Sequence, residues 1–272
     1  MTVSVLMGIY NCESTLSAAI ESILGQTFSD WELIMCDDGS SDHTYLVAST
    51  YAERFSSKIQ LMKNERNKGL NYTLNRCLAA ASGDYIARMD GDDISYPTRF
   101  EEEVSFLDQH PQYALVSTPM VYFDEYGEWG RGSAIEAPER RDFIQGTPFC
   151  HAPCMIRKSV MEQLGGYSND PHTLRAEDYD LWFRLYASGF RGYNLSEPLY
   201  KMRDDQNAIH RRTFRYAINE AYVRFHGYRL LSLPLYSYIW VLRPIVISLL
   251  PKRVYKSLHQ RRQRERQSEI TI

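Results

Sequence analysis

The sequence predicts an α/β fold built on a mostly parallel sheet, and two patterns support this prediction. Apolar runs that suit strands alternate with helix-like segments through residues 1–93, as in a parallel sheet covered on both faces. Two of these runs end in acidic, glycine-containing clusters, at Asp37–Asp42 and Asp90–Asp93. Open α/β sheets bind ligands at the carboxyl ends of their strands, so we expect a binding site where these clusters meet.

The elements of the first half follow in order. Strands are expected at residues 3–9, 31–36, 58–63 and 85–89, and helices at residues 14–24, 41–55 and 69–81. Ser14 is the expected N-cap of the first helix, and Ser41 or Asp42 that of the second. The alternation is then lost, and the expected elements are a helix at 97–110, a strand at 113–123, a glycine-rich loop at 127–132 and an apolar helix up to residue 188.

Composition indicates one sizeable folded domain, or one domain with an appendage. The chain has 272 residues, of which 44% are hydrophobic, and its net charge of −3 gives no reason to expect nucleic acid as a partner. The five cysteines form no CxxC pair, which is typical of reduced thiols in a cytoplasmic protein. Met1 leads directly into an apolar run without a basic region, so we expect a first strand there and not a signal peptide.

Asp90 and Asp92 form the centre of the second acidic cluster. They stand two residues apart, so in an extended segment both carboxylates point to one side and repel each other unless a cation lies between them. Mg²⁺ and Mn²⁺ are held by one or two carboxylates together with substrate phosphates. The sequence has neither GxGxxG after its first strand nor a P-loop, which leaves a metal or side chains to meet phosphates. The alternative is an exposed acidic turn, since Asp and Gly are ordinary turn residues.

A third acidic group, Glu177–Asp178, stands immediately before an apolar helix. Acidic residues at a helix start are favourable for the helix dipole alone, so capping is the simpler interpretation. A catalytic carboxylate is the alternative.

Four motifs in this order resemble family 2 glycosyltransferases of the GT-A fold. They are Val3–Asn11, Trp31–Asp42, Gly83–Asp93 and Glu177–Asp178. Within that family the chain is similar to the EpsE-type transferases of biofilm exopolysaccharide operons, through Met7–Cys12, Gly146–His151 and Gly189–Leu195. The resemblance implies a GT-A catalytic domain over residues 1–205, with a nucleotide-sugar-binding half (1–93) and an acceptor half (94–205), followed by a helical, basic extension (206–272).

The resemblance also implies roles for single residues. Asp38, with Asp37 beside it, would accept a hydrogen bond from uracil, and Tyr10 would pack against the nucleoside. Asp90 would contact the ribose or the metal, and Asp92 would bind the Mn²⁺ or Mg²⁺ that bridges the diphosphate.

Asp178 would be the general base that deprotonates the acceptor hydroxyl, supported by Glu177, with inversion at the anomeric carbon. The chain departs from many relatives at Leu74 and at Met202–Asp205, where an arginine and a histidine are missing. His151 and Arg203 are therefore candidate diphosphate or acceptor contacts.

The extension is apolar and basic. Arg211–Phe225 predicts an amphipathic helix, whose apolar side carries Phe214, Ile218, Ala221, Tyr222 and Phe225. Leu230–Leu250 is apolar but interrupted by prolines and Arg243, which argues against a membrane span. Residues 252–266 carry seven Lys or Arg against one Glu. Either Tyr236, Tyr238 and Trp240 enter an anionic membrane surface beneath this basic end, or the segment folds back on the domain.

The function that these observations favour is sugar transfer from a UDP-sugar to a saccharide or lipid-linked saccharide acceptor in exopolysaccharide synthesis. The enzyme would be cytoplasmic and peripheral to the cell membrane. The alternative is a docking scaffold that binds a protein partner through the helix at Thr44–Phe55 or through the basic tail.

Overall fold

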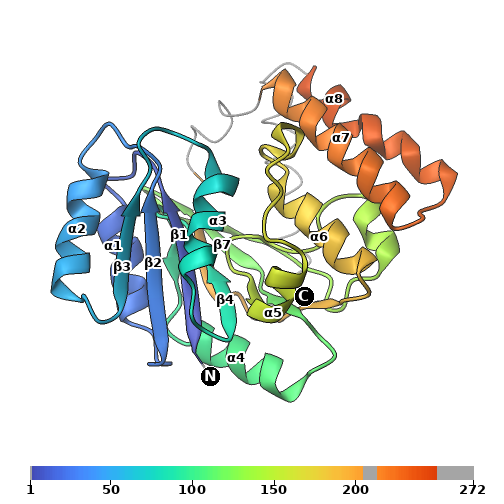
Figure 1. The fold of residues 1–272 in the computed structure, drawn as a ribbon. Coiled ribbons are helices and arrows are strands. Elements are labelled where there is room, and N and C mark those ends of the chain that lie inside the picture. The colour runs from blue at the N-terminus through green and yellow to red at the C-terminus, as the bar shows by residue number, and fades with distance from the viewer. Residues whose placement is uncertain (1, 205–212, 250–272) are drawn as a thin grey trace.

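A seven-stranded sheet forms the centre of the computed structural model, which describes residues 2–204 and 213–249 (Figure 1). The strand order is β10-β6-β9-β4-β1-β2-β3. The bounds are β1 (Val3–Ile9), β2 (Trp31–Asp37), β3 (Ile59–Lys63), β4 (Tyr85–Arg88), β6 (Leu115–Ser117), β9 (Met155–Arg157) and β10 (Gly192–Asn194). Only β9 runs antiparallel to its neighbours in this sheet. The predicted α/β class is confirmed.

Helices cover both faces of this sheet. Val5 and Met7 of β1 point into the core beneath α1 (Leu16–Leu24), α2 (Thr44–Arg54) and α4 (Arg99–Gln109). Leu6 points to the other core, beneath α3 (Leu70–Ala80), α5 (Lys158–Gln163) and α6 (Glu177–Ala187). This alternation is the period of two that a strand buried on both faces requires. Short 3₁₀ turns lie at η1 (Arg140–Ile144) and η2 (Pro171–Thr173).

The expected helix caps are only partly correct. Thr15, not Ser14, precedes α1, and its hydroxyl donates to the Gly91 carbonyl oxygen (2.9 Å) instead of capping the helix. This bond ties α1 to the acidic turn. Before α2, the Asp42 carboxylate accepts from the backbone N–H of Thr44 (3.0 Å), so Asp42 supports that helix start as expected.

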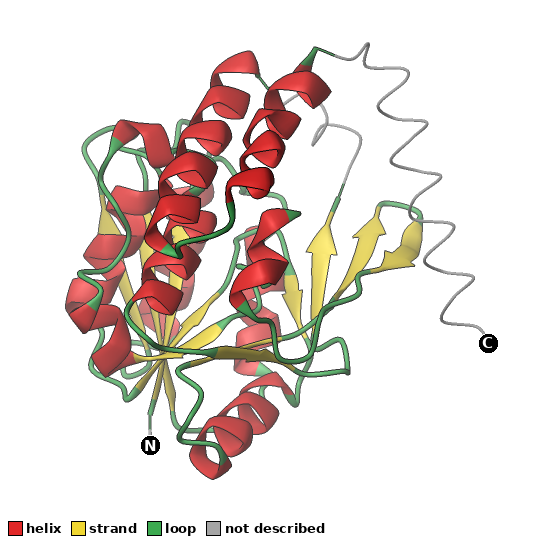
Figure 2. Cartoon of the chain, turned by 90° about the vertical axis from the view of Figure 1, so that its right-hand side faces the viewer, coloured by secondary structure: helices red, strands yellow, loops and turns green. Residues whose placement is uncertain are grey.

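A smaller sheet lies beside the first, in the order β5-β11-β7-β8 (Figure 2). Its strands are β5 (Ile94–Ser95), β7 (Met120–Asp124), β8 (Gly127–Arg131) and β11 (Tyr200–Arg203). The single strand expected at 113–123 was wrong, because the chain leaves β6 at Thr118–Pro119 and enters β7 in the other sheet. The glycine-rich loop expected at 127–132 was also wrong, since β8 pairs with β7 and the Trp129 ring stacks on Tyr122.

The C-terminal elements are α7 (Phe214–Leu230), η4 (Leu235–Leu242) and α8 (Arg243–Ser248). The apolar side expected for α7 was only partly right: Ala221 is buried and Tyr222 packs against the core, but Phe214, Ile218 and Phe225 are exposed, and the buried side also carries Ala217 and Tyr228. Through this side α7 joins the same core as α6. The basic cluster at 252–266 lies outside the described residues. Within the described ranges, no helix combines the length and apolarity needed to cross a bilayer.

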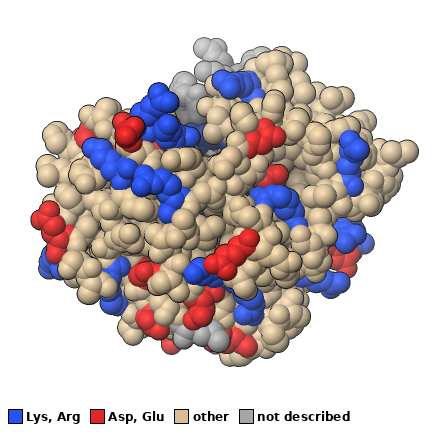
Figure 3. All heavy atoms as spheres, viewed as in Figure 1, with Lys and Arg blue, Asp and Glu red and all other residues tan. Residues whose placement is uncertain are grey.

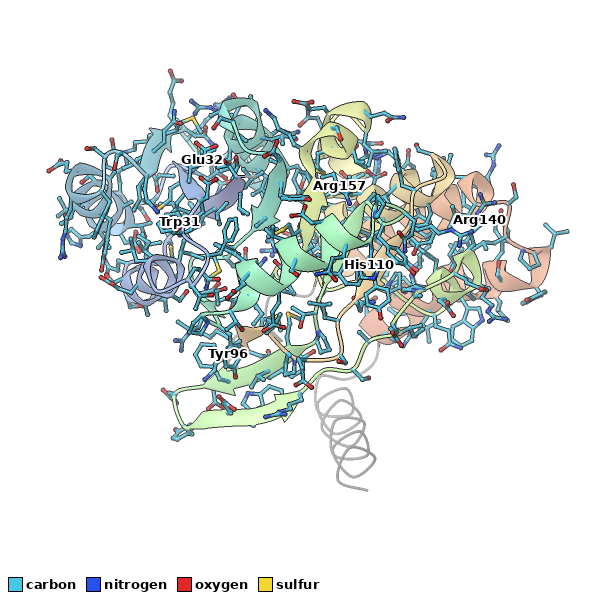
Figure 4. All side chains as sticks on the ribbon, turned by 90° about the horizontal axis from the view of Figure 1, so that it is seen from below. Trp31, Glu32, Tyr96, His110, Arg140 and Arg157 are labelled. Carbon is cyan, nitrogen blue, oxygen red and sulfur yellow. The ribbon has the colours of Figure 1, made fainter. Side chains whose placement is uncertain are left out.

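Hydrogen bonds that hold the fold together lie at the end of the seven-stranded sheet where the parallel strands begin (Figure 4). Glu32 accepts from the Ser4 hydroxyl (2.6 Å) and the Ser82 N–H (2.7 Å). Arg157 donates to the carbonyl oxygens of Leu107 (2.6 Å) and Tyr113 (3.0 Å). The predicted site residues lie at the opposite end of the sheet, where the parallel strands end.

Candidate active site

The loops after β1 and β2 form one wall of the site. Ile9 pairs with Asp37 in register, and the Asp38 N–H donates to the Ile9 carbonyl oxygen (2.9 Å). Asn11, with a φ of 48°, receives Ser41 N–H on its side-chain oxygen (2.9 Å). Tyr10 is held next to Asp38 with half of its surface exposed (50%).

Asp37 and Asp38 are both buried in this wall. Asp38 accepts three hydrogen bonds, from the Asn64 amide (2.7 Å) and the backbone N–H groups of Lys68 (2.8 Å) and Gly69 (2.9 Å). Asp38 therefore organises the loop that enters α3. The Asp37 carboxylate accepts only longer bonds from the Ser40 N–H, at 3.3 and 3.4 Å.

The acidic turn after β4 forms the floor. The Arg88 guanidinium pairs with Asp90 at 2.6 Å, and the Asp90 N–H donates to the Tyr200 hydroxyl (3.1 Å). Arg203 lies against the same turn, since its backbone N–H donates to Asp93 (2.7 Å) and its Nε to the Asp92 carbonyl oxygen (3.2 Å). Burial, together with the negative charges of Asp90 and Asp92, raises the pKa of Asp93 well above its usual value.

A buried ion pair supports the turn from below. Arg99 and Glu103 are fully buried and pair at 3.1 Å. Arg99 also donates to the carbonyl oxygens of Arg88 (3.1 Å) and Cys154 (3.3 Å), which fixes the end of β4. Burial raises the pKa of Glu103 to about 7, against the opposing effect of Arg99.

The start of α6 places Glu177 and Asp178 on the other side of the site. Arg175, just before the helix, has a φ of 67°, a conformation that non-glycine residues adopt rarely and often at functional sites. Burial, and then the charge of Glu177, raise the pKa of Asp178 to about 7. Oε2 of Glu177 is buried without a hydrogen-bond partner among the described residues.

His151 packs against α6, the helix that carries Asp178 near its start. Its Nε2 is 2.9 Å from the Tyr167 hydroxyl, and its ring meets Trp182 of α6 edge-on. Burial, and then Arg88, hold the pKa of His151 well below its usual value, so the imidazole is neutral. Of the two candidate contacts, Arg203 thus lies beside the acidic turn and His151 against Tyr167 and Trp182.

Arg88 is the site residue that the sequence analysis missed. Burial alone would lower its pKa, but the charge of Asp90 outweighs this and the pKa lies above its usual value. The same cation acts on both Asp178 and His151, lowering the pKa of each. Arg88 therefore links the acidic turn electrostatically to Asp178. A lone arginine in an otherwise apolar strand, two residues before Asp90, was the signal.

The carboxylates of the turn fit a cation bound together with phosphates better than a cage made by protein alone. Among the described residues, no group of three His, Cys, Asp or Glu side chains is arranged to hold a metal. The raised pKa of Asp93 nevertheless records an excess of negative charge around the turn. One oxygen of Asp90 is paired with the Arg88 guanidinium.

A cavity of about 460 Å³ lies at the other end of α6, lined by residues that include Tyr186, Arg140 and Arg191. Arg140 is visible at that end in Figure 4. None of the predicted site residues lines this cavity, so we do not assign the chemistry to it.

Comparison with known proteins shows similarity to glycosyltransferases. Residues 4–165 match glycosyl transferase family 2, and residues 85–259 match glycosyl transferase family group 2. EpsE of Bacillus subtilis (strain 168) is 48% identical over 260 residues, covering 96% of this chain and 94% of that protein. The Escherichia coli enzyme named UDP-Glc:alpha-D-GlcNAc-diphosphoundecaprenol beta-1,3-glucosyltransferase WfgD is 42% identical over 217 residues, covering 78% of this chain and 81% of that one.

Two solved structures share the fold. TarS 1-349 of S. aureus in complex with UDP-GlcNAc has a TM-score of 0.68 and 18% identity, covering 93% of this chain and 83% of that one. The mannosyltransferase PcManGT from Pyrobaculum calidifontis, in complex with GDP-Man and Mn²⁺, has a TM-score of 0.63 and 18% identity, covering 95% and 79%. The sequence matches and the shared GT-A fold lead to one conclusion: the chain belongs to glycosyl transferase family 2.

Proposed function

We propose that the chain is an inverting glycosyltransferase that moves a sugar from a UDP-sugar to a saccharide acceptor carried on a lipid, in exopolysaccharide synthesis. The observation that carries this proposal is the Arg88 link between the acidic turn, suited to a nucleotide diphosphate, and Asp178, a carboxyl group whose pKa is raised to about 7. Donor binding falls to residues 1–93 and acceptor binding to residues 94–205.

The nucleoside binds over the loops after β1 and β2. Tyr10 offers its exposed ring to the nucleoside. Oδ2 of Asp38 accepts a hydrogen bond from the Gly69 N–H, and a carboxylate oxygen has capacity for another, so it can take the uracil N–H. Asp37 supports this loop through Ser40, and Asp90 reaches toward the ribose.

The diphosphate binds at the acidic turn. Asp92, assisted by Asp90, would hold Mn²⁺ or Mg²⁺, which supplies positive charge to the UDP leaving group. Arg203 is positioned at the same turn by Asp92 and Asp93, and its guanidinium adds a second cation for the phosphates. Arg203 thus takes the place of the arginine and histidine that many relatives have and this chain lacks.

Asp178 acts as general base on the acceptor hydroxyl. A base whose pKa is close to the working pH gives the best balance of ionised form and basicity. Glu177 maintains that pKa by its charge. Deprotonation by Asp178 directs the hydroxyl to the sugar face opposite the leaving UDP, which inverts the anomeric carbon. His151, neutral and hydrogen-bonded to Tyr167, borders the acceptor.

The acceptor class follows from relatives. The name of WfgD gives a UDP-sugar as donor, a diphosphoundecaprenol-linked sugar as acceptor and a β linkage as product. The likeness to EpsE supports a place in exopolysaccharide synthesis for biofilm. A lipid-linked acceptor requires a cytoplasmic enzyme to work peripherally at the membrane.

The docking scaffold remains the rival proposal, with α2 as one candidate surface. A scaffold has no need for a carboxyl group with a pKa near 7 or for the Arg88 link, so these features favour the enzyme. Hydrolysis of UDP-sugars by the purified chain, in Mn²⁺ and in chelator, separates the two functions.

Metal-dependent donor binding tests the proposal. We expect calorimetry to show tight UDP binding in Mn²⁺, with weak binding in chelator and for Asp92→Ala. Glu53→Ala, an exposed carboxylate on α2, serves as control and should bind like the wild type. Equal UDP affinity in all four titrations would exclude the metal role of Asp92.

A further inference from the structure

We propose that the C-terminal apolar surface, defined by Leu235, Tyr236, Ile239, Leu242, Val246 and Leu249, enters the interface of an anionic lipid bilayer. The surface lies on η4 and α8. The proposal deepens the proposed function, on which it rests for the need to reach a lipid-linked acceptor. Its evidence is independent of the catalytic residues.

The apolar side chains of this surface are unusually exposed. The exposed fractions are 88% for Leu235, 73% for Tyr236, 72% for Ile239, 56% for Leu242, 58% for Val246 and 70% for Leu249. Contiguous apolar surface of this kind marks an interaction site, whereas single exposed apolar residues do not. Eleven of the seventeen exposed large apolar side chains in residues 2–204 and 213–249 lie from Phe214 onward.

The inner side of the same segment is anchored, so the outer side has a defined orientation. Ser237 is fully buried, and its hydroxyl donates to the Pro234 carbonyl oxygen (2.6 Å). The Tyr238 ring packs edge-on against Tyr228 and Phe225 of α7, at 5.8 Å from each. Tyr238 therefore faces inward, which contradicts its expected entry into the interface, while Tyr236 faces outward as expected.

The charge of the segment suits an anionic partner. The sequence has no Asp or Glu between residues 221 and 264. Arg229 is exposed at the end of α7, and the Arg243 guanidinium lies 5.9 Å from the Trp240 ring while one of its nitrogens donates to the Gln145 carbonyl oxygen. In Figure 3 the surface over α7 and α8 is mostly uncharged. Aliphatic and aromatic side chains flanked by Lys and Arg are typical of interfacial anchoring.

Two other occupants fit this surface less well. A second copy would place the same patch against itself around a two-fold axis and bring the cations of both copies together. Residues 250–272 of the same chain carry the seven-cation cluster in their sequence, which does not complement an apolar face. An anionic bilayer matches both the apolar and the basic character.

Docking by this surface also keeps the base near the acceptor. The segment is attached to α7, and α7 packs on α6, which begins with Glu177 and Asp178. A lipid-linked sugar can thus reach Asp178 while its carrier stays in the bilayer.

Vesicle sedimentation with the full chain tests the proposal. We expect the wild type to bind vesicles of phosphatidylcholine mixed with phosphatidylglycerol, and to bind phosphatidylcholine alone weakly. Because each apolar side chain that leaves water favours partitioning about tenfold or more, the double variant L235S/I239S should lose most of this binding. Leu46→Ser removes an apolar side chain that is 61% exposed on α2, at the far side of the molecule, and should bind like the wild type (Figure 1).

The outcomes separate this proposal from the proposed function. With a water-soluble acceptor, L235S/I239S should transfer sugar like the wild type, and with acceptor in vesicles it should be slower. If the wild type and L235S/I239S bind vesicles equally, the C-terminal apolar surface is not the membrane-binding surface, even if transfer occurs. A dimer in lipid-free solution that L235S/I239S converts to monomer would also overturn it. Vesicle binding that depends on Leu235 and Ile239 would support it even if no UDP-sugar is turned over.

Discussion

At the residue scale, the decisive feature is that Asp178 is stabilised poorly as an anion. Burial and the neighbouring Glu177 both disfavour its charge, and the hydrogen bond from the Tyr179 backbone N–H and the charge of Arg88 offset them only in part. A residue present only to cap α6 would gain from being ionised in the first turn. The raised pKa therefore fits a proton acceptor better than a cap.

Because ionising Asp178 destabilises the folded protein, replacing it with a neutral side chain should increase the free energy of unfolding. The pKa of Asp178 rises from 3.8 in the unfolded chain to about 7 in the folded one, so the penalty is absent near pH 4, develops as the pH rises and is complete above about 7. Asp178→Asn should therefore raise the free energy of unfolding at pH 8 by on the order of 1 to 3 kcal/mol and leave it unchanged near pH 4. Denaturant unfolding at both pH values measures this, and a loss of stability at pH 8 would favour the capping interpretation.

Arg88 should set the pH at which transfer begins. Its cation lowers the pKa of Asp178, so replacing it with Met should move the acidic limb of the kcat/KM profile to higher pH. We also expect transfer at the pH optimum to fall about ten- to a hundredfold, the value of one charge-assisted hydrogen bond. Arg88→Lys keeps the charge and should keep the wild-type limb. If the acidic limb of the kcat/KM profile lies at the same pH in Arg88→Met and the wild type, Arg88 has only a structural role.

Single residues were predictable where spacing alone decided their position. Asp90, Asp92 and Asp178 stand at a strand end or helix start that the hydrophobic pattern already locates. The pairing of Asp90 with Arg88 and the three bonds to Asp38 depend on how strands and loops meet in space. The two-residue spacing of Arg88 and Asp90 hinted at their pairing, but no spacing in the sequence could show the three bonds to Asp38.

At the element scale, the contact between α6 and α7 depends on Gly227. A Cβ built on Gly227 would lie 2.1 to 2.3 Å from atoms of the Phe183 ring. Glycine within a helix costs about 1 kcal/mol relative to alanine, so its presence here has a packing reason. The close approach lets α7 cover the core behind Asp178.

Gly227→Ala should therefore destabilise the protein despite the better helix propensity of alanine. Overpacking of this kind costs about 1 to 3 kcal/mol, which we expect to see as a lower midpoint of thermal unfolding. Gly146→Ala is the matched control, because nothing lies within 4 Å of its added Cβ and its stability should be unchanged. If both variants have the unfolding midpoint of the wild type, the α6–α7 contact has room for an added Cβ, which would contradict this prediction.

The first-half elements were predictable and several later ones were not. Residues 3–89 alternate between strand and helix with strong apolar periodicity, and the structure confirms this order. The smaller sheet escaped prediction because β7 and β8 pair through Trp129 and Tyr122 across a turn, in a segment rich in glycine. The apolar side of α7 was misjudged in part because Phe214, Ile218 and Phe225 are exposed, while Ala217 and Tyr228 are buried.

At the scale of the whole molecule, segments from the first and second halves of the chain meet where the parallel strands end. The acidic turn and the loops after β1 and β2 come from residues 1–93, and α6 brings Asp178 from residues 94–205. Arg88 acts on both sides of this junction. In the proposed function, transfer is the joint work of a donor site and a general base that share one cation.

The most direct test compares sugar transfer and UDP affinity in Asp178→Asn, with Asp180→Asn as control. Asp180 lies in the same first turn of α6 but pairs with Arg184 at 2.8 Å, so its replacement tests the helix start without touching the base. We expect Asp178→Asn to keep wild-type UDP affinity and lose transfer by about two to four orders of magnitude, while Asp180→Asn retains transfer. Wild-type transfer by Asp178→Asn, or equal losses in both variants, would contradict the assignment of Asp178 as the base.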